Sequence, residues 1–371
     1  MSDTNTAPAP QWIATRPDIE AYAAAAASEK LLGLDTEFIR TQTFFAELGL
    51  VQLASGDQIS LVDPLVPELI PGLAALIADP NRVKIVHSAS EDLEVIAHAL
   101  SVVPAPLFDT QIAAVLCGYE QPPSYQKLVA RELAITLDKQ ATRTDWLKRP
   151  LDAEQLRYTA EDVLHLEALY QRLDERLESL GRRGWMVEEC QRALEKSRQP
   201  LDPHPHLKMR GAERMTPIQQ QRLWRLLHWR DREALARNRP KRWILDNPVA
   251  MRAALLDQPD LKALESAVAA DGKPSAKLAA KLETLLRQPV SQEELAIPLL
   301  LAQTDPEKQR SKELRERATA AAKFLNLSPD FLLPRRGLEY WARHDALPDD
   351  LLGWREQVLE LGGVPPAENP S

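Results

Sequence analysis

Hydrophobic and polar positions between residues 31 and 115 switch repeatedly between a strand-like and a helix-like period. Short apolar runs predict four strands, at residues 31–34, 48–54, 58–62 and 83–87. Ser55-Gly56-Asp57 predicts a hairpin turn, and Ser88-Ala89-Ser90-Glu91 predicts a capping box that starts a helix over residues 91–100. A hairpin followed by strand and helix units predicts a mixed sheet with helices packed on it.

Helical periods dominate after residue 107, and prolines mark the domain boundaries. Apolar residues at every third or fourth position predict one long helix over residues 152–180. Three prolines within residues 200–205 predict an extended, stiff linker, and a second proline-rich break follows at residues 289–298. We therefore expect a loose tail, an α/β domain, a linker and two all-α domains, at residues 1–10, 11–198, 199–211, 212–290 and 291–371.

The composition of the 371-residue chain, 44% hydrophobic and 27% charged, is that of an ordinary globular protein. No apolar run approaches the roughly 20 residues of a membrane helix, and residues 1–10 lack the basic start of a signal peptide. Cys117 and Cys190 are the only cysteines, which is typical of a reducing compartment and excludes a cysteine-bound zinc cluster. We expect a cytoplasmic protein without a membrane segment.

The net charge of −8 is unevenly distributed along the chain. Residues 208–242 contain eleven basic and three acidic side chains, a local charge of +8, so the remainder sums to −16. A basic stretch on an acidic protein indicates a polyanionic partner held at one place, although exposed helices are often charged without a partner.

Carboxylates supply the candidate chemistry. Asp35 and Glu37 are two positions apart on a predicted strand, so their side chains share one face. Two unpaired carboxylates there would repel each other unless they were solvated or bound to a cation, and a solvated strand end is also consistent with this spacing. Asp92 lies in the first turn of a predicted helix, where the helix dipole alone favours an acid.

Tyr158 and Asp162 are four positions apart on a predicted helix and therefore share a face, which any amphipathic helix also allows. Asp35, Glu37, Asp92 and Asp162 taken together are oxygen ligands of the kind that Mg²⁺ and Mn²⁺ prefer. The set therefore predicts a divalent-metal site.

Three segments around these residues resemble the motifs of the four-carboxylate 3′→5′ exonucleases: Leu34-Asp35-Thr36-Glu37-Phe38, Val86-His87-Ser88-Ala89-Ser90-Glu91-Asp92 and Tyr158-Thr159-Ala160-Glu161-Asp162. Tyrosine four residues before the last aspartate marks the tyrosine-containing branch of these enzymes. Leu48-Gly49-Leu50-Val51-Gln52-Leu53 and the segment over residues 137–147 resemble the ribonuclease D family within that branch.

The helical regions fit the same resemblance. Leu227-His228-Trp229-Arg230-Asp231 followed by Arg239-Pro240-Lys241-Arg242-Trp243 resembles an HRDC domain, a small helical nucleic-acid-binding module. Pro334-Arg335-Arg336-Gly337-Leu338 and Leu352-Gly353-Trp354-Arg355 resemble a second, more divergent copy. The resemblance implies a ribonuclease H-like α/β exonuclease domain, with a mixed sheet flanked by helices, followed by two all-α HRDC-type domains.

The resemblance also implies a mechanism with two divalent metal ions, Mg²⁺ or Mn²⁺. Asp35, Glu37 and Asp162 would hold the ion that carries the attacking water, and Asp35 and Asp92 would hold the ion that stabilises the leaving 3′-oxygen. Tyr158 would orient the water, because a phenol with an ordinary pKa near 10 is a poor base at neutral pH. The products would be nucleoside 5′-monophosphates from single-stranded RNA 3′ ends, with transfer RNA precursors as the expected substrate.

Contacts to RNA are expected from aromatic and basic side chains. Phe44, Phe45 and Tyr125 would stack on bases, unless they pack in the core, whereas Trp229 and Trp243 are expected in the core. The expected nucleic-acid contacts are Phe44, Gln52, His87, Lys139, Arg143, Arg222, Arg225 and Arg242, and the HRDC footprint adds Arg232, Arg239 and Lys241.

Two other functions remain open from the residues. The chain would be a non-catalytic nucleic-acid-binding protein if a carboxylate were missing, but all four are present. A DNA exonuclease is not excluded, although Gly272-Lys273-Pro274 does not complete a phosphate-binding loop, so neither a helicase motor nor a nucleotide cofactor is expected. We expect a monomer that acts on RNA.

Overall fold

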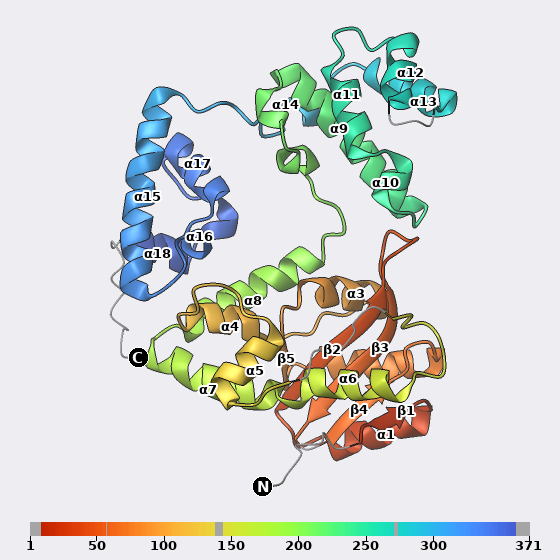
Figure 1. Ribbon diagram of the computed structural model, residues 1–371, viewed down its shortest axis with the longest axis vertical. Helices are drawn as coiled ribbons and strands as arrows, with labels where there is room; N and C mark the ends of the chain where they lie inside the picture. Colours follow the sequence, from red (N-terminus) through yellow and green to blue (C-terminus); the bar gives the residue numbers. More distant parts are fainter. Residues whose placement is uncertain (1–8, 57, 138–143, 271–273, 361–371) are drawn as a thin grey trace. The chain divides into compact units, whose positions relative to one another are not determined.

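The computed structural model describes residues 9–56, 58–137, 144–270 and 274–360 (Figure 1). The chain divides into two compact units. The first unit contains residues 1–39, 47–198 and 304–371, and the second contains residues 40–46 and 199–303. No helix in the described ranges is long and apolar enough to span a bilayer.

A six-stranded mixed sheet forms the centre of the first unit, in the order β1-β4-β3-β2-β5-β6. The strands are β1 Gln11–Ile13, β2 Leu31–Ile39, β3 Glu47–Ser55, β4 Gln58–Val62, β5 Val83–Val86 and β6 Leu107–Asp109. Strand β3 pairs antiparallel with β2 and β4, and the remaining pairings are parallel. Gly56, at φ +55°, adopts the left-handed conformation that a tight hairpin requires. The predicted hairpin and mixed sheet are confirmed.

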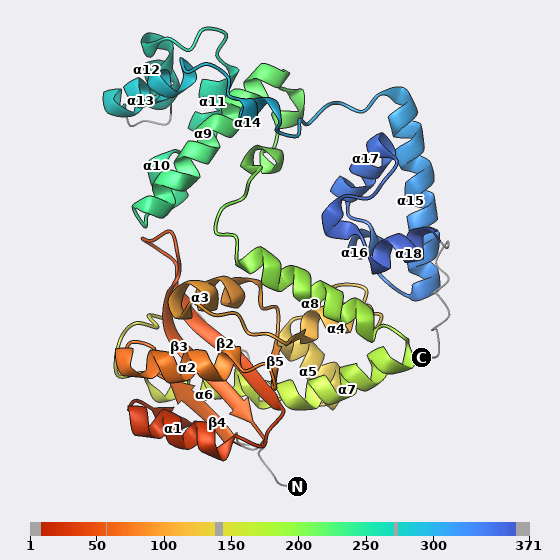
Figure 2. The ribbon, with the colours of Figure 1, turned by 180° about the vertical axis from the view of Figure 1, so that it is seen from behind.

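Helices cover both faces of this sheet (Figures 1 and 2). They are α1 Arg16–Ala25, α2 Ile70–Ala78, α3 Ser90–Leu100, α4 Thr110–Leu116, α5 Tyr125–Leu133, α6 Ala153–Leu164, α7 Leu166–Ser179 and α8 Arg183–Ser197. Helix α6 packs against β2, β3 and β4, and α3 packs against β2 and β3. Both α3 and α6 thus pack on the middle strands of the sheet, and the candidate carboxylates lie on β2, α3 and α6.

Two local predictions in this region were wrong. The helix predicted over residues 152–180 is broken at His165, whose backbone N–H donates to the Tyr125 hydroxyl at 3.2 Å. The predicted capping box at α3 is absent, because the N-cap residue is Ala89. The Asp109 carboxylate instead accepts the backbone N–H groups of Ser88 and Ala89, at 3.0 and 2.9 Å. The Tyr125 side chain therefore binds the backbone at the break between α6 and α7, and the Asp109 side chain binds the backbone at the start of α3.

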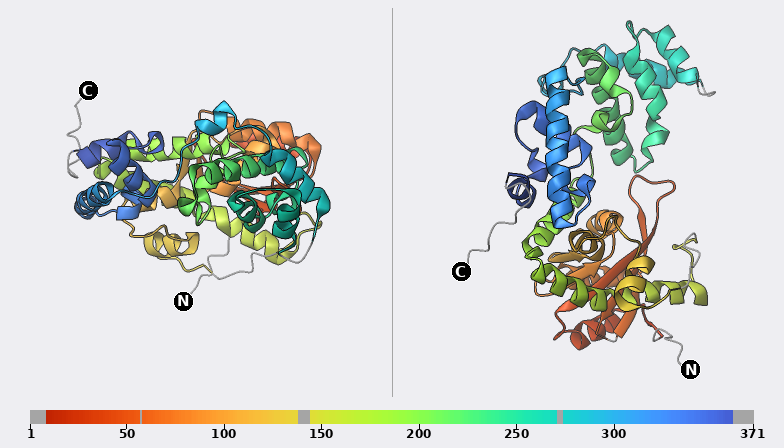
Figure 3. Two further views of the ribbon diagram at one scale, coloured as in Figure 1. Left: turned by 90° about the horizontal axis from the view of Figure 1, so that it is seen from above. Right: turned by 60° about the vertical axis from the view of Figure 1, so that its left-hand side comes forward.

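The C-terminal helices, α15 Asp305–Leu325, α16 Pro329–Leu332, α17 Arg335–His344 and α18 Trp354–Glu360, belong to the first unit and gather around α15 (Figure 3). Trp354 stacks on Trp185 of α8, with ring centroids 4.5 Å apart. Buried Arg182 donates to the carbonyls of Leu116 and Leu325, at 2.6 and 2.7 Å. These C-terminal helices therefore pack directly on the α/β domain of the same unit.

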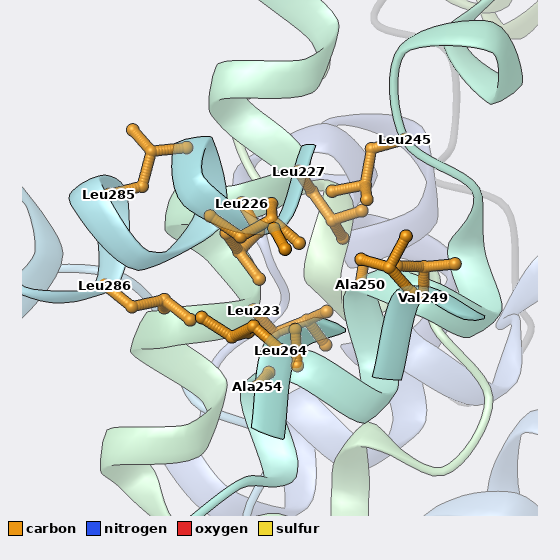
Figure 4. Packing of buried hydrophobic residues seen from close by; sticks show 14 of the residues in the cluster. Leu223, Leu226, Leu227, Leu245, Val249, Ala250, Ala254, Leu264, Leu285 and Leu286 are labelled. Carbon is orange, nitrogen blue, oxygen red and sulfur yellow. The ribbon is translucent and has the colours of Figure 1, made fainter. Parts of the chain in front are cut away.

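The second unit is helical, with α9 Pro217–Ala236, α10 Lys241–Ile244, α11 Asn247–Leu255, α12 Leu261–Ala269, α13 Ala276–Leu286 and α14 Gln292–Leu295. The predicted capping box of Thr216 and Gln219 starts α9. Leu223, Leu226 and Leu227 of α9 lie at the centre of its apolar core (Figure 4).

The limits of this unit differ from the expected boundaries. The predicted linker is not a free spacer, because His206 is buried and the Trp224 indole N–H donates to the Pro203 carbonyl at 2.8 Å. Residues beyond 290 also belong here, since the Gln220 side chain bonds both the N–H and the carbonyl of Leu300. The first helical domain thus extends from about the proline-rich segment to residue 303.

Candidate active site

Three of the predicted carboxylates converge at the middle of the sheet. Asp35 and Glu37 leave the same face of β2, and Asp162 comes from α6, which packs on that face. One carboxylate oxygen from each residue lies within 4.8 Å of the others. A β-bulge between Glu37 and Phe38 shifts the pairing with β3 directly beside this cluster, a position where bulges commonly re-aim side chains.

Asp92 reaches the cluster by a different route. It lies in the first turn of α3, and its carboxylate accepts a hydrogen bond from the hydroxyl of buried Thr36. Thr36 is positioned for this role because it lies between Asp35 and Glu37 and its side chain leaves the opposite face of the strand. Sequence reasoning missed Thr36, although its alternation between two carboxylates was a usable signal.

Burial and mutual repulsion make these carboxyl groups weak acids. Burial, followed by the charges of Asp92, Asp162 and Glu37, holds the pKa of Asp35 well above its ordinary value. Burial, with Asp162 and Asp92, raises the pKa of Glu37 to about 9. Burial raises the pKa of Asp162 to about 7 and that of Asp92 to about 6. Such a cluster binds either protons or a cation at neutral pH, and clustered carboxylates are suitable ligands for hard divalent ions.

The raised pKa values predict how stability depends on pH when chelator is present. The folded state retains protons that the unfolded chain releases near its ordinary carboxyl pKa of about 4, so stability falls as pH rises. We expect the Tm of the chelated protein to fall by at least about 5 °C between about pH 5 and pH 9. Mg²⁺ should reverse much of this loss at the high-pH end.

A matched pair of variants assigns this effect. Glu37→Gln should flatten the dependence of Tm on pH, because it removes the group whose pKa is raised to about 9. Glu154→Gln, on the exposed part of α6, should leave the slope as in wild type. Equal slopes for all three proteins would show that the cluster does not hold excess protons.

Tyr158 lies one helical turn before Asp162, near enough that the phenol and the carboxylate shift each other's pKa. Burial, followed by the charge of Asp162, raises the pKa of the Tyr158 phenol, so the phenol stays protonated at neutral pH and acts as a donor. Its ring stacks on Trp146, with centroids 6.1 Å apart and an interplanar angle of 27°.

Trp146 is held close to the sheet by Gly49 and Arg149. A Cβ at Gly49 would lie 2.7 Å from the Trp146 carbonyl oxygen, so a larger residue would displace the tryptophan. The Arg149 guanidinium donates to the Gly49 carbonyl at 2.6 Å and pairs with both oxygens of Asp63. Sequence reasoning missed Arg149 and Asp63, which lie 86 positions apart without a local motif.

Of the residues of the first unit that were expected to contact RNA, His87, Gln52 and Tyr125 lie inside the fold, and two others lie outside the described ranges. Both ring nitrogens of His87 have partners, the Thr110 hydroxyl at 2.9 Å and the Pro123 carbonyl at 3.2 Å. The Tyr125 hydroxyl donates to the Glu161 carbonyl at 3.2 Å, so Tyr125 supports the break between α6 and α7. Gln52, opposite Asp35 in the sheet register, is completely buried, and its amide atoms have no hydrogen-bond partner in the described ranges. Lys139 and Arg143 lie outside the described residues.

The second unit also differs from the expected RNA footprint. Arg225 is buried against Glu294 and donates to the carbonyls of Leu285, Gln288 and Pro289, so it has no free side for a phosphate. Arg222 donates to the Leu256 carbonyl at 2.7 Å, and the Phe44 ring is mostly buried. Arg242 is exposed, as expected for a phosphate contact.

The tryptophans of this unit were expected in the core. Trp229 packs partly buried on the apolar core. Trp243 instead is 51% exposed.

Comparison with known proteins agrees with this arrangement. A family model described as 3′-5′ exonuclease matches residues 10–178, which contain all four carboxylates and Tyr158. The fold and the acidic site therefore define a 3′→5′ exonuclease that carries additional helical domains.

The relatives extend this match over the whole chain. Ribonuclease D of Xanthomonas oryzae pv. oryzae is 40% identical over 96% of this chain and 98% of its own length. Ribonuclease D of Pseudomonas paraeruginosa is 35% identical over 95% and 96%. The crystal structure of Escherichia coli RNase D, an exoribonuclease involved in structured RNA processing, superposes with a TM-score of 0.80 at 27% identity, covering 95% of this chain and 98% of that one. This chain belongs to the ribonuclease D family and is an exoribonuclease of the hydrolase class.

Proposed function

We propose that this enzyme shortens RNA from single-stranded 3′ ends, releases nucleoside 5′-monophosphates, and acts on structured precursors such as those of transfer RNA. The convergence of Asp35, Glu37 and Asp162 within 4.8 Å carries the proposal, because an acidic cluster repels a phosphate backbone unless cations neutralise it. The similarity to a structured-RNA exoribonuclease supports the substrate class.

We assign two divalent cations, Mg²⁺ or Mn²⁺, to the cluster. Asp35, Glu37 and Asp162 would hold one, and Asp35 and Asp92 would hold the other. When bound, such ions lower the pKa of a coordinated water and stabilise charge on the attacking and leaving oxygens. The raised carboxyl pKa values support this assignment, because part of each shift comes from repulsion between neighbouring carboxylates, which a bound cation would relieve as the protons leave.

The protein's own residues position these ligands. Thr36 fixes the orientation of Asp92 through its hydrogen bond, and Tyr158 lies beside Asp162, one turn earlier on α6. We assign to the Tyr158 hydroxyl the orientation of the attacking water, as a neutral hydrogen-bonding group, because its raised pKa prevents it from acting as the base. Gln52 is assigned to the support of the site beside Asp35, on the neighbouring strand, rather than to RNA contact, since it is completely buried.

A 5′-labelled RNA with a hairpin and a single-stranded 3′ tail tests the activity, beside a DNA of the same sequence. We expect a ladder that shortens from the 3′ end of the RNA with Mg²⁺ or Mn²⁺ and is absent with chelator. With uniformly labelled RNA, the released product should co-migrate with nucleoside 5′-monophosphates. Faster loss of the DNA would contradict an RNA substrate, and binding without cleavage under either metal would contradict the catalytic assignment.

We further propose that the enzyme acts as a monomer in the cytoplasm. Both cysteines are free, and Cys190 is buried, which is consistent with a reducing compartment. Sedimentation analysis at micromolar concentration should give one species of about the 41.6 kDa chain mass.

A further inference from the structure

The basic stretch of the second unit separates into internal and exposed cations. Arg225 and Arg230 are buried in ion pairs with Glu294 and Asp231, and Lys241 also pairs with Asp231 at 2.7 Å. Four exposed arginines gather where α9 ends and α10 begins, at Arg232, Arg237, Arg239 and Arg242, and the exposed Arg210 and Arg214 lie before α9. Arg237 pairs with Glu233 across one helical turn. Arg232, Arg239 and Arg242 are therefore exposed cations that take no part in these ion pairs.

Trp243 lies on α10 among these arginines, and it is 51% exposed. Two positions later, Leu245 is 1% exposed and joins the apolar core of the unit, whereas Trp243 does not. The Arg239 guanidinium lies 5.9 Å from the centre of the Trp243 ring, within the range of a cation–π contact. The fold therefore leaves about half of a large aromatic residue exposed at a charged surface, outside the apolar core.

An exposed indole beside exposed arginines has a specific chemical complement. Single-stranded nucleic acids are bound by aromatic rings on which bases stack, flanked by cations that neutralise phosphates. Arg239 and Arg242 flank this ring in the sequence and are exposed cations on a chain of net charge −8, so charge favours a polyanion over an ordinary protein surface. Charge complementarity and ring exposure thus point to the same ligand.

We propose that Trp243, with Arg239 and Arg242, forms a stacking site for one base of single-stranded RNA and its flanking phosphates. This assignment rests on the proposed RNA substrate and moves the RNA-binding surface of the helical unit away from Arg222 and Arg225, whose N–H groups are used within the fold. It also replaces the core role that the sequence suggested for Trp243.

Binding of a fluorescent single-stranded RNA of about 12 nucleotides, measured by anisotropy with chelator present, tests this site without cleavage. Trp243→Ala should raise the Kd about tenfold, within the range of one lost stacking contact, and Trp243→Phe should restore most of the affinity. Phe324→Ala is the matched control, because Phe324 is also an exposed aromatic residue, at 67%, but lies on α15. Its Kd should equal that of wild type.

The charged part of the site has its own readout. Arg239→Ala with Arg242→Ala should reduce the slope of log Kd against log salt, since each phosphate contact contributes to that slope. Thermal unfolding of the Trp243 variants should match wild type, which excludes a folding defect.

The outcomes separate this site from the proposed function. If wild type binds RNA and Trp243→Ala binds it equally well, the stacking site is wrong and the proposed function stands. If the wild-type protein itself does not bind RNA, the proposed RNA substrate is contradicted, and the stacking site with it.

Discussion

Replacing Asp35 by Asn is expected to reduce exonuclease turnover by at least about 10³-fold, about 4 kcal/mol of transition-state stabilisation. Asp35 is the residue that both assigned cations share, and its pKa is raised by burial and by all three other carboxylates. An amide keeps the size of the side chain but removes the charge, so the cations lose their common ligand. Single-turnover cleavage of a labelled RNA with saturating Mg²⁺ measures the loss.

The same substitution should stabilise the metal-free protein. The amide of Asp35→Asn would carry no charge into a cluster where the carboxylates repel one another, so the Tm with chelator should rise above that of wild type at pH 8. Loss of activity together with a raised Tm distinguishes removal of a ligand from damage to the fold. Asp257→Asn, an exposed carboxylate in the second unit, should change neither quantity. Normal turnover by Asp35→Asn would show that the chemistry lies elsewhere.

The carboxylate site could be predicted because its information is local. Asp35 and Glu37 share a face through strand alternation, and Tyr158 and Asp162 share a face through helical periodicity, so each pair is readable within five residues. The hairpin of β3 and β4 was readable for the same reason, since Gly56 sits between two apolar runs. The structure adds the convergence of these segments, which spacing alone does not contain.

The predictions that failed depend on partners remote in sequence. Asp109 caps α3 from 20 residues away, and Thr36 bonds Asp92 across 56 residues. Both are hydrogen bonds that form only after the sheet has brought β2, β6 and α3 together. A residue's own neighbours in the chain therefore give no reason to expect them.

The arginines of the second unit show most clearly that contacts between distant residues cannot be predicted from local sequence. Arg225 and Arg242 belong to one basic stretch and look alike in the sequence, yet Arg225 pairs with Glu294, 69 residues away, and Arg242 is exposed. The family of small helical domains suggested a phosphate contact for both. Only the burial of each side chain in the structure distinguishes an arginine that is free to bind a phosphate from one that pairs within the protein.

Arg225→Ala should therefore destabilise the second unit by about 3–5 kcal/mol, the usual cost of leaving one member of a buried ion pair without its partner. The Glu294 side chain is only 4% exposed, and three backbone carbonyls would lose their donor as well. Burial raises the pKa of Glu294, but the hydrogen bond from Arg225 and other contacts hold that pKa below its ordinary value. Arg225→Ala would therefore leave a buried carboxylate without its positive partner. Urea unfolding measures the loss, and hydrogen exchange of the α9 amides locates it in this unit.

Two further variants make the assignment specific. Arg242→Ala should change stability by less than about 0.5 kcal/mol, because an exposed arginine without a buried partner contributes little. Arg225→Met combined with Glu294→Leu should recover only the part of the loss that comes from the unpaired charge, because the carbonyls of Leu285, Gln288 and Pro289 still lack their donor. The opposite pattern, normal stability of Arg225→Ala with weakened RNA binding, would return Arg225 to the role of a phosphate contact and contradict its burial.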